Sequence, residues 1–443
     1  MLDNLLSRLI DITETENNSP FSNDGAYEAI AHKKQELVEK WKKFDKEEKI
    51  QNGGDLKKYF KNQGLNEAQD SALNSSKNFY LLKKEINARL ATDDPSRLLP
   101  INDLHFEQAI LELVENMENT EHVRELYKIR KRAVGESKNS GINASEASRI
   151  KNCMRQGREL YLAGKSGSLM VKPLNFFYSL TAYAYALIIL NNPIRTSLDS
   201  LPGSHGLNYI PDGMKSQVGG DMPQGTFSDL LCAFPTLSVR NAEFSIQQDA
   251  SYSLLEFFKR RHTIGIGTLL SMIPEIREYY RIATGEIGRT HPLSVSMGKS
   301  DRSIVWEFQI GDGERRPDLS DIESSFKDFP VSERFGKYIV SVPASDTFKI
   351  SACISCDARG NLWYIENPFY PVVFPEICIH FILASALSNL MRYSPDHWGS
   401  VLLNETNTDQ SLITRKYLSA FENKFPILIL RSISKYFPYV AES

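Results

Sequence analysis

The longest uncharged segment of the chain limits the fold most strongly. It covers residues 174–190, LNFFYSLTAYAYALIIL, with Lys172 and Pro173 before it and Asn191, Asn192 and Pro193 after it. Seventeen residues without a charge fall just short of the length that crosses a bilayer, and the tyrosine, serine, threonine and asparagine residues make the segment more polar than a typical span. We therefore expect a buried core helix and no membrane segment.

Composition narrows the class of protein further. The 443 residues suffice for two domains with buried cores, and a net charge of -3 excludes a uniformly basic nucleic-acid coat, although not a local basic patch. Five cysteines are few and odd in number, which is not the pattern of a disulfide framework. The first residues, MLDNLLSRLIDITETENN, lack the basic start of a signal peptide. Both features predict a cytoplasmic protein.

Periodicity divides the chain into two regions. Residues 1–140 form a charged helical region, with amphipathic segments at 26–44, 104–117 and 121–134. GESKNSGINASEASR, residues 135–149, has the composition of a linker. Within it, Asn143 and Glu146 have the spacing of a capping pair that opens the next helix. We expect a second region, the core, over residues 141–443.

The core contains three kinds of segment. Residues 193–244 are rich in glycine and proline and predict loops, a stretch long enough to favour a functional role. Residues 303–365 alternate and carry β-branched and aromatic side chains, which predicts antiparallel strands, the last two joined by a turn at 357–360. Residues 375–440 are helical. The fold class is therefore α+β, predominantly helical, with a small antiparallel sheet in the second half of the core.

Five sequence pieces in a fixed order resemble one family. They are GRELYLAGKSGSLMVKPLNFFYSLTAYAYAL, SHGL, GTLLSMIPEI, GNLWYI and ALSNLMRYSPDHWG. In this order they resemble the YaaC-like proteins of bacteria, over residues of about 150–435. The resemblance implies a fold and a bacterial source, and it makes residues 1–140 an addition. It implies no chemistry, although stress or anti-phage defence is a role that the genetic context of relatives suggests.

Arg392 and His397, in RYSPDH, have the spacing of the Arg–His motif of HEPN ribonucleases, helical enzymes that cleave RNA without a metal. Histidine can accept the 2′-hydroxyl proton and arginine can hold the phosphate. Pro395 lies between them, however, so the pair should straddle a helix end. In the structural alternative, Arg392 caps the helix while Trp398 packs behind the turn.

A second histidine, His205, lies in the glycine-containing loop SHGL. A polar side chain in a loop that is attached to a buried scaffold is a candidate for catalysis or binding. The loop at 203–225 could form a pocket for a nucleotide or another small ligand. In the alternative, His205 only bonds to the backbone.

Basic residues are in excess between Arg124 and Arg158. Such an excess can bind phosphates by releasing counterions, or it can simply face solvent. The candidate nucleic-acid contacts are Lys128, Arg130, Lys131, Arg132, Arg155 and Arg158.

Two further patterns were weighed and set aside. Cys353 and Cys356 have the spacing of half a zinc site that Cys378 and His380 could complete, but strand alternation would turn the first two apart. Pro395–Asp396 and Glu422–Asn423–Lys424 imitate a nuclease motif, but both stand in helical context, which favours chance. We predict no metal and no cofactor.

Together these patterns lead to two hypotheses. The first is a bacterial interaction or effector protein that recruits a protein partner through its N-terminal helices, with no membrane contact. The second is a metal-independent ribonuclease that uses Arg392 and His397, with RNA or DNA at the basic stretch. Both are compatible with a homo-oligomer.

Overall fold

The structure is a computed structural model, and it describes residues 98–101, 106–133, 141–192, 195, 197–220, 225–233, 257–258, 260–300, 303–311, 316–326, 329–343, 353–357, 361–369, 374–403, 408–434 and 437–440. The chain divides into two compact units, residues 1–85 with 298–305 and residues 86–297 with 306–443. Of the first unit, only residues 298–300 and 303–305 are described. The helix predicted at 26–44 lies outside the described residues.

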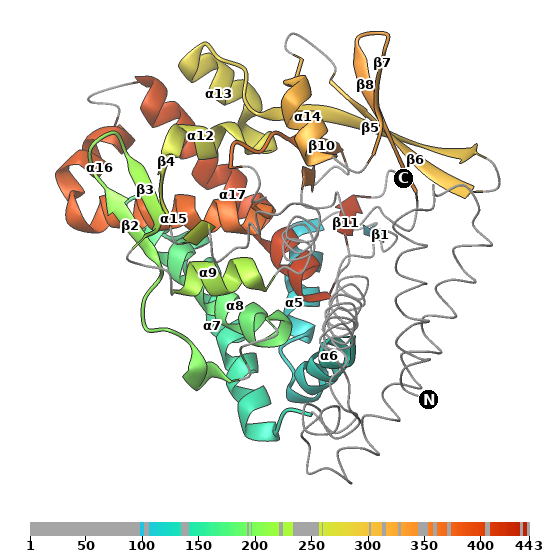
Figure 1. Ribbon diagram of the computed structural model, residues 1–443. Helices are drawn as coiled ribbons and strands as arrows, with labels where there is room; N and C mark the ends of the chain where they lie inside the picture. Colours follow the sequence, from blue (N-terminus) through green and yellow to red (C-terminus); the bar gives the residue numbers. More distant parts are fainter. Residues whose placement is uncertain are drawn as a thin grey trace, which may run out of the picture. The chain divides into compact units, whose positions relative to one another are not determined.

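Helices make up most of the second unit (Figure 1). They are α5 (Phe106–Asn116), α6 (Thr120–Ala133), α7 (Ala144–Ser166), α8 (Lys172–Asn191), α9 (Thr226–Cys232), α12 (Ile266–Ser271), α13 (Arg277–Thr284), α14 (Leu319–Ser325), α15 (Glu376–Tyr393), α16 (Pro395–Leu403) and α17 (Thr408–Ser434), with 3₁₀ turns η1 (Leu198–Ser200) and η2 (Pro274–Ile276).

Within the described ranges, the strands form three sheets. Their bounds are β1 (Leu98–Ile101), β2 (Leu207–Ile210), β3 (Lys215–Gly219), β4 (Arg261–Gly265), β5 (Thr290–Ser300), β6 (Ser303–Ile310), β7 (Val331–Arg334), β8 (Lys337–Pro343), β9 (Ile354–Cys356), β10 (Leu362–Ile365) and β11 (Phe437–Val440). Six of them form one sheet in the order β7-β8-β6-β5-β10-β9, β2-β3-β4 form a second sheet, and β1 pairs in parallel with β11.

The start of α7 follows from its capping residue. Asn143 has extended backbone, and its side-chain oxygen accepts a hydrogen bond of 2.7 Å from the backbone N–H of Glu146, as the spacing predicted. The carboxylate of Glu146 does not complete the reciprocal bond. It accepts instead from the backbone N–H of Leu198, at 2.7 Å, and pairs with Arg149. The sequence could not predict this, because Leu198 is 52 residues away.

Helices α7 and α8 approach closely because two glycines of α7 face aromatic rings of α8. A side chain at Gly157 would collide with the ring of Tyr183, and one at Gly164 would meet Phe176. The close approach also lets the Ser179 hydroxyl donate to the carbonyl of Gly157, at 2.6 Å. Glycine is therefore required here for packing.

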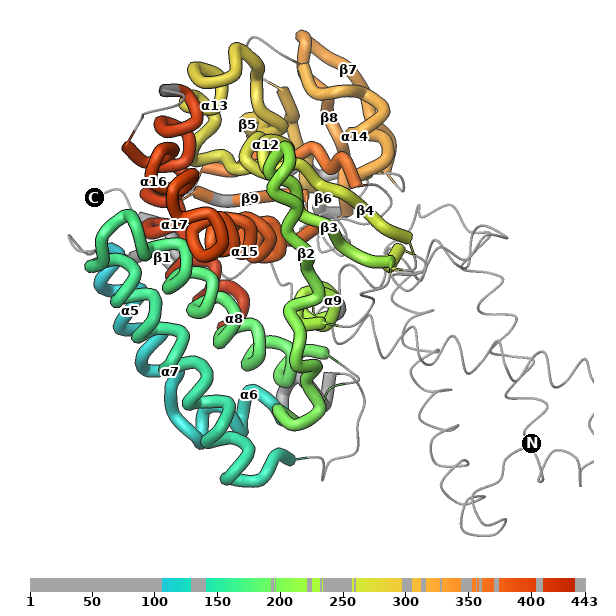
Figure 2. Tube along the Cα trace, turned by 90° about the vertical axis from the view of Figure 1, so that its left-hand side faces the viewer, coloured from blue at the N-terminus to red at the C-terminus, as the bar shows by residue number. Residues whose placement is uncertain are grey.

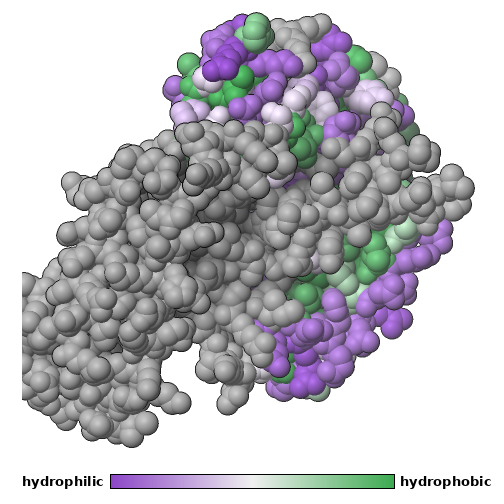
Figure 3. Space-filling view, turned by 90° about the vertical axis from the view of Figure 1, so that its right-hand side faces the viewer, coloured by the Kyte–Doolittle hydropathy of each residue, from purple (hydrophilic) through white to green (hydrophobic). Residues whose placement is uncertain are grey.

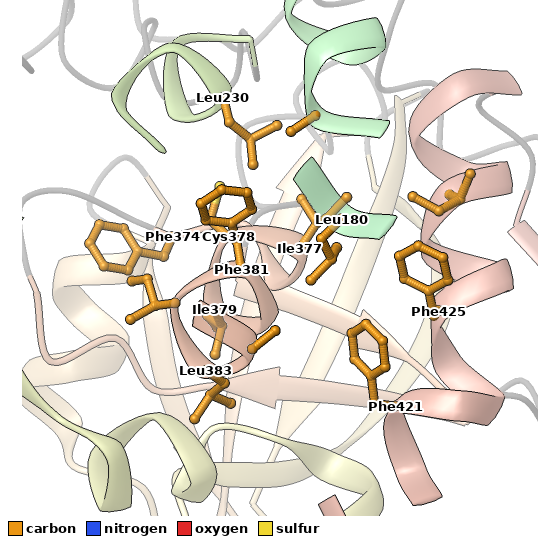
Figure 4. Close-up of a cluster of buried hydrophobic side chains, with 14 of the residues drawn as sticks. Leu180, Leu230, Phe374, Ile377, Cys378, Ile379, Phe381, Leu383, Phe421 and Phe425 are labelled. Carbon is orange, nitrogen blue, oxygen red and sulfur yellow. The ribbon is translucent and has the colours of Figure 1, made fainter. Parts of the chain in front are cut away.

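The predicted buried helix is the centre of the unit. Helix α8 packs between α7 and α15, as the tube view shows (Figure 2). It is long and apolar enough to cross a membrane, but most of its residues are buried inside the unit. Phe381 and Ile377 of α15 meet Leu180 of α8, and Phe421 and Phe425 of α17 close the same cluster (Figure 4).

The six-stranded sheet carries different chemistry on its two faces. Tyr364 of β10 and His291 of β5 are opposite each other in the register and share one face, where the Tyr364 hydroxyl donates to Ser325 of α14 at 3.1 Å. Ser355 of β9 stands on the other face and donates to Glu376 of α15 at 2.8 Å. One face is thus in contact with α14 and the other with the long C-terminal helices.

The predicted fold class is confirmed, with two differences in detail. The hairpin from Ile354 to Ile365 forms as expected, and Asp357 accepts from the backbone N–H of Asn361 at its turn. Residues 193–244, predicted as loop, contain the hairpin β2–β3 and the helix α9. Short strands separated by glycines give little periodicity, and the hairpin is stabilised through the pairing of β3 with the distant β4.

Candidate functional site

The corner between α15 and α16 carries the strongest candidates from the sequence. Helix α15 ends at Tyr393, and its cap Ser394 leaves the helical region of backbone space because Pro395 follows. Pro395 then opens α16, and the backbone N–H of Trp398 donates to the carbonyl of Ser394 at 2.9 Å. Arg392 and His397 therefore stand on two different helices.

Trp398 fixes this corner to the turn before α8. Its side chain is fully buried, and its indole N–H donates to the carbonyl of Met170 at 3.1 Å. Burial of an indole ring together with a satisfied N–H makes a rigid anchor. This bond ties residues 169–171 to the start of α16, the helix that follows directly after the end of α15.

Arg392 lies on the outside of this corner. Its guanidinium carbon is 4.7 Å from the centre of the Tyr393 ring, and one of its nitrogens donates to the Tyr393 hydroxyl at 2.6 Å. The bond thus goes to a neighbouring side chain rather than to the last carbonyls of α15. His397 is exposed in the first turn of α16. No hydrogen bond joins Arg392 to His397 among the described residues.

His205 is the histidine that the fold brings close to Arg392. Its ring meets the Phe177 ring edge-on at 4.9 Å, and its Nδ1 is buried without a hydrogen-bond partner. Burial, and next the charge of Arg392, lower the pKa of His205 below its usual value. His205 is therefore neutral at neutral pH. The sequence named both residues but could not show that they are neighbours.

Exposed apolar side chains occur on both segments that Trp398 joins at this corner. Leu169, Met170 and Val171 are 36%, 42% and 44% exposed, and Tyr393 is 68% exposed. We call these four residues, together with Arg392, the corner surface. Solvent-facing apolar side chains next to one another are typical of binding sites, whereas single ones are common on any protein.

Comparison with known protein families places the chain. Residues 115–433 match the family described as YaaC-like Protein. The chain belongs to the YaaC-like family. No curated protein and no solved structure matches it. The family region begins inside the charged segment that the sequence suggested as an addition, so α6 is part of it, and it contains the whole corner surface.

The basic stretch of the YaaC-like region is partly engaged in ion pairs. Arg158 lies 2.7 Å from Glu118 and 3.2 Å from Glu115, and Arg155 lies 2.8 Å from Glu159. Lys128 is exposed on α6. The coloured surface at the lower right of the space-filling view is mainly hydrophilic, with some hydrophobic residues (Figure 3). The side chains of Arg130, Lys131 and Arg132 lie outside the described residues. Nucleic-acid binding by this stretch stays a prediction.

A buried ion cluster in the YaaC-like region escaped the sequence analysis. The ammonium of Lys424 lies 2.8 Å from Glu275 and 3.0 Å from Glu376, and it donates to Ser355 at 3.1 Å. Helix α17, η2, β9 and α15 each contribute to this cluster, which binds one sheet face to the helices. A lone lysine in the apolar run AFENKFPILIL was the only local signal.

Lys424 and the carboxylates of the cluster stabilise one another's charged forms. Burial alone would raise the pKa of Glu376, but Lys424, with help from His380 and Ser355, lowers it to about 2. The two carboxylates in turn raise the pKa of Lys424 above its usual value, although burial opposes them. Both groups are therefore charged at neutral pH. The Nε2 atom of His380 is buried without a hydrogen-bond partner.

A second buried cluster lies on the opposite face of the sheet. His291 and Glu366 are fully buried, and Nε2 of His291 is 2.7 Å from the Glu366 carboxylate. Arg289 contacts the other oxygen of Glu366 at 3.4 Å and approaches Asp321 of α14. A bonded His–carboxylate pair resembles catalytic machinery, but a histidine without solvent contact more often stabilises a core.

The patterns set aside in the sequence are placed as follows. Cys353 and Cys378 are buried thiols, and Nδ1 of His380 is 3.3 Å from the Tyr417 hydroxyl. Among the residues that the structure describes, no group of His, Cys, Asp or Glu could hold a metal ion. Glu422 pairs with Lys172, and Asp396 is exposed at the start of α16. Glu422 and Lys424 therefore pair with groups other than Asp396.

Proposed function

We propose that this YaaC-like chain is a cytoplasmic interaction protein that binds a protein partner through the corner surface. The observation that carries the proposal is the exposed, stacked pair Arg392 and Tyr393, at the corner to which Trp398 ties the exposed apolar residues 169–171. Arginine and tyrosine are enriched among residues that dominate binding energy, particularly next to apolar neighbours.

Rigidity of the surface supports this function. Trp398 is fully buried and bonded to Met170, so the two halves of the surface keep a fixed relation. The Tyr393 ring and hydroxyl hold the Arg392 guanidinium in place. A side chain that is already ordered loses little entropy on binding.

Helices α5 and α6 carry less of the proposal than the sequence suggested. Ile110 and Val114 of α5 and Val123 and Tyr127 of α6 are buried, and both helices pack against other helices of the same unit. Their apolar faces therefore serve the chain's own core. Recruitment of a partner through residues 1–97, which lie outside the described residues, stays a prediction.

Site-specific photo-crosslinking in the native host tests the proposal. A benzophenone amino acid replaces Tyr393, and a matched control carries it at Phe335, an exposed aromatic residue of the β7–β8 hairpin. We expect a protein adduct at position 393 only. The partner, once identified and purified, should bind the wild type at least about tenfold more tightly than Arg392→Ala. Equal affinities would contradict the proposal.

The biological setting is part of the same proposal. Stress or anti-phage defence is the role that the family resemblance suggested. The gene is deleted, and the deletion strain is complemented with the wild type or with Arg392→Ala. We expect phage challenge to kill more cells of the deletion strain and of the Arg392→Ala strain than of the wild-type complement. Unchanged survival of the deletion strain would remove the defence role and leave partner binding intact.

A metal-independent ribonuclease is the second candidate function. It is favoured by the exposure of Arg392 and His397 at adjoining helix ends, with neutral His205 close to Arg392. A neutral histidine can accept the 2′-hydroxyl proton while arginine holds the phosphate. Incubation of labelled RNA in EDTA tests it with Arg392→Ala, His397→Ala and His205→Ala. Absence of cleavage by the wild type would exclude this activity.

A further inference from the structure

From the charges at the corner we infer that the partner of the corner surface is a second copy of this chain, related to the first by a twofold axis. The inference rests on the proposed function, because it names the occupant of the same surface. It is carried by three exposed side chains of the corner, the cation Arg392, the anion Asp396 and the apolar ring of Tyr393.

The charges of the corner complement each other across a twofold axis. Arg392 lies in the last turn of α15 and Asp396 in the first turn of α16, and both side chains are exposed. In the described part of the chain neither of them forms an ion pair. A twofold axis brings the same patch of both copies together, so residue i meets residue j twice. Arg392 of each copy can then face Asp396 of the other.

Apolar residues lie where such an axis would pass. Tyr393 separates Arg392 from the turn at Ser394 and is the most exposed apolar residue of the corner. Residues 169–171 are tied to the same corner, because the Trp398 indole N–H donates to the carbonyl of Met170. Isologous interfaces commonly have an apolar centre with charged groups at the rim. The corner surface has this composition.

A different protein would not need the same charge balance. A partner of another sequence could match a patch of a single sign equally well, whereas a charged patch of a single sign repels its own copy across a twofold axis and one that holds both signs does not. Asp396 stands in the first turn of α16, where the helix dipole favours a carboxylate, so its charge is also compatible with folding. This balance favours the second copy over other occupants.

Charge exchange tests the inference with the full chain in analytical ultracentrifugation at micromolar concentration. We expect the wild type to sediment as a dimer. Arg392→Asp leaves the patch with negative charge only, and Asp396→Arg leaves it with positive charge only, so each variant alone should weaken the dimer at least about tenfold. The two variants mixed should again form dimers, because each then supplies the charge that the other lacks.

Matched controls separate a lost interface from a lost fold. Arg334→Asp makes the same charge change at an exposed arginine of β7 and should leave the dimer intact. Circular dichroism and the melting temperature establish that each variant is folded. A monomeric wild type, a dimer that neither variant weakens, or a mixture that stays monomeric would overturn the inference. If the wild type is a monomer but the chain with benzophenone at position 393 still crosslinks to a protein, the proposed function stands and the partner is a different protein.

Discussion

Replacing Lys424 by methionine is the perturbation whose effect the structure defines best. Methionine keeps an unbranched side chain of similar length but removes the charge between Glu275 and Glu376. The Lys424 and Glu376 side chains are 1% and 5% exposed, so water cannot replace the missing ammonium at Glu376. Removing one partner of a buried ion pair typically costs about 3–5 kcal/mol. We expect the free energy of unfolding to fall by about that amount.

Urea denaturation at neutral pH measures this loss, with the slope of the transition as the check that the unfolded state is unchanged. Adding Glu376→Gln to Lys424→Met should restore part of the stability, since the second change removes the unpaired charge. Glu275 is 18% exposed and retains some hydration, so Glu275→Gln should restore less. A loss below about 1 kcal/mol for Lys424→Met would refute the reasoning.

The same cluster predicts how stability depends on pH. The pKa of Glu376 is about 2 in the folded chain, because Lys424, helped by His380 and Ser355, outweighs the effect of burial. A carboxyl whose pKa is lowered by folding contributes stability above its unfolded pKa, near 4.5, and loses it as the pH falls toward 2. Urea midpoints should therefore drop in acid for the wild type. In Lys424→Met, burial is no longer outweighed, so the pKa of Glu376 is no longer held low. If the urea midpoint of this variant fell in acid as much as that of the wild type, the acid sensitivity would not come from Glu376.

Three further substitutions have expected outcomes. Gly157→Ala should lower stability by about 1–3 kcal/mol in urea, because a methyl group there collides with Tyr183 between α7 and α8; an unchanged midpoint would mean that the helices move apart freely. Phe335→Asn should leave stability equal or raise it by about 0.5–1 kcal/mol, because this exposed residue has a φ of 51°, which asparagine tolerates better; a lower melting temperature would reveal a contact of the ring. Trp398→Ala should cost about 3–5 kcal/mol, and a smaller loss in chemical denaturation would show that the corner is not anchored as described.

Local patterns predicted much of the fold. The uncharged run at 174–190 became α8, Asn143 caps α7, and the turn after Cys356 joins β9 to β10. Each depends on residues near one another in the chain, where side-chain period and capping chemistry operate. The hairpin β2–β3 was missed because its strands are short and its pairing with β4 is not local.

The candidate site also has features that the local sequence determines and features that only the tertiary structure determines. Pro395 by itself determined that Arg392 and His397 stand on separate helices, because proline acts on its immediate neighbour. Only the tertiary structure decided that His205 lies close to Arg392, that Trp398 ties residues 169–171 to the start of α16, and that Lys424 meets Glu275 and Glu376.

The physical reason is sequence distance. Backbone preference and amphipathic period are properties of a few consecutive residues, so the sequence alone determined the helices, the caps and the buried run. Neighbours on the corner surface and in the ion cluster come from segments more than a hundred residues apart in several cases. Their meeting, and with it the charge and exposure of each group, is set by how the helices and sheets pack against each other.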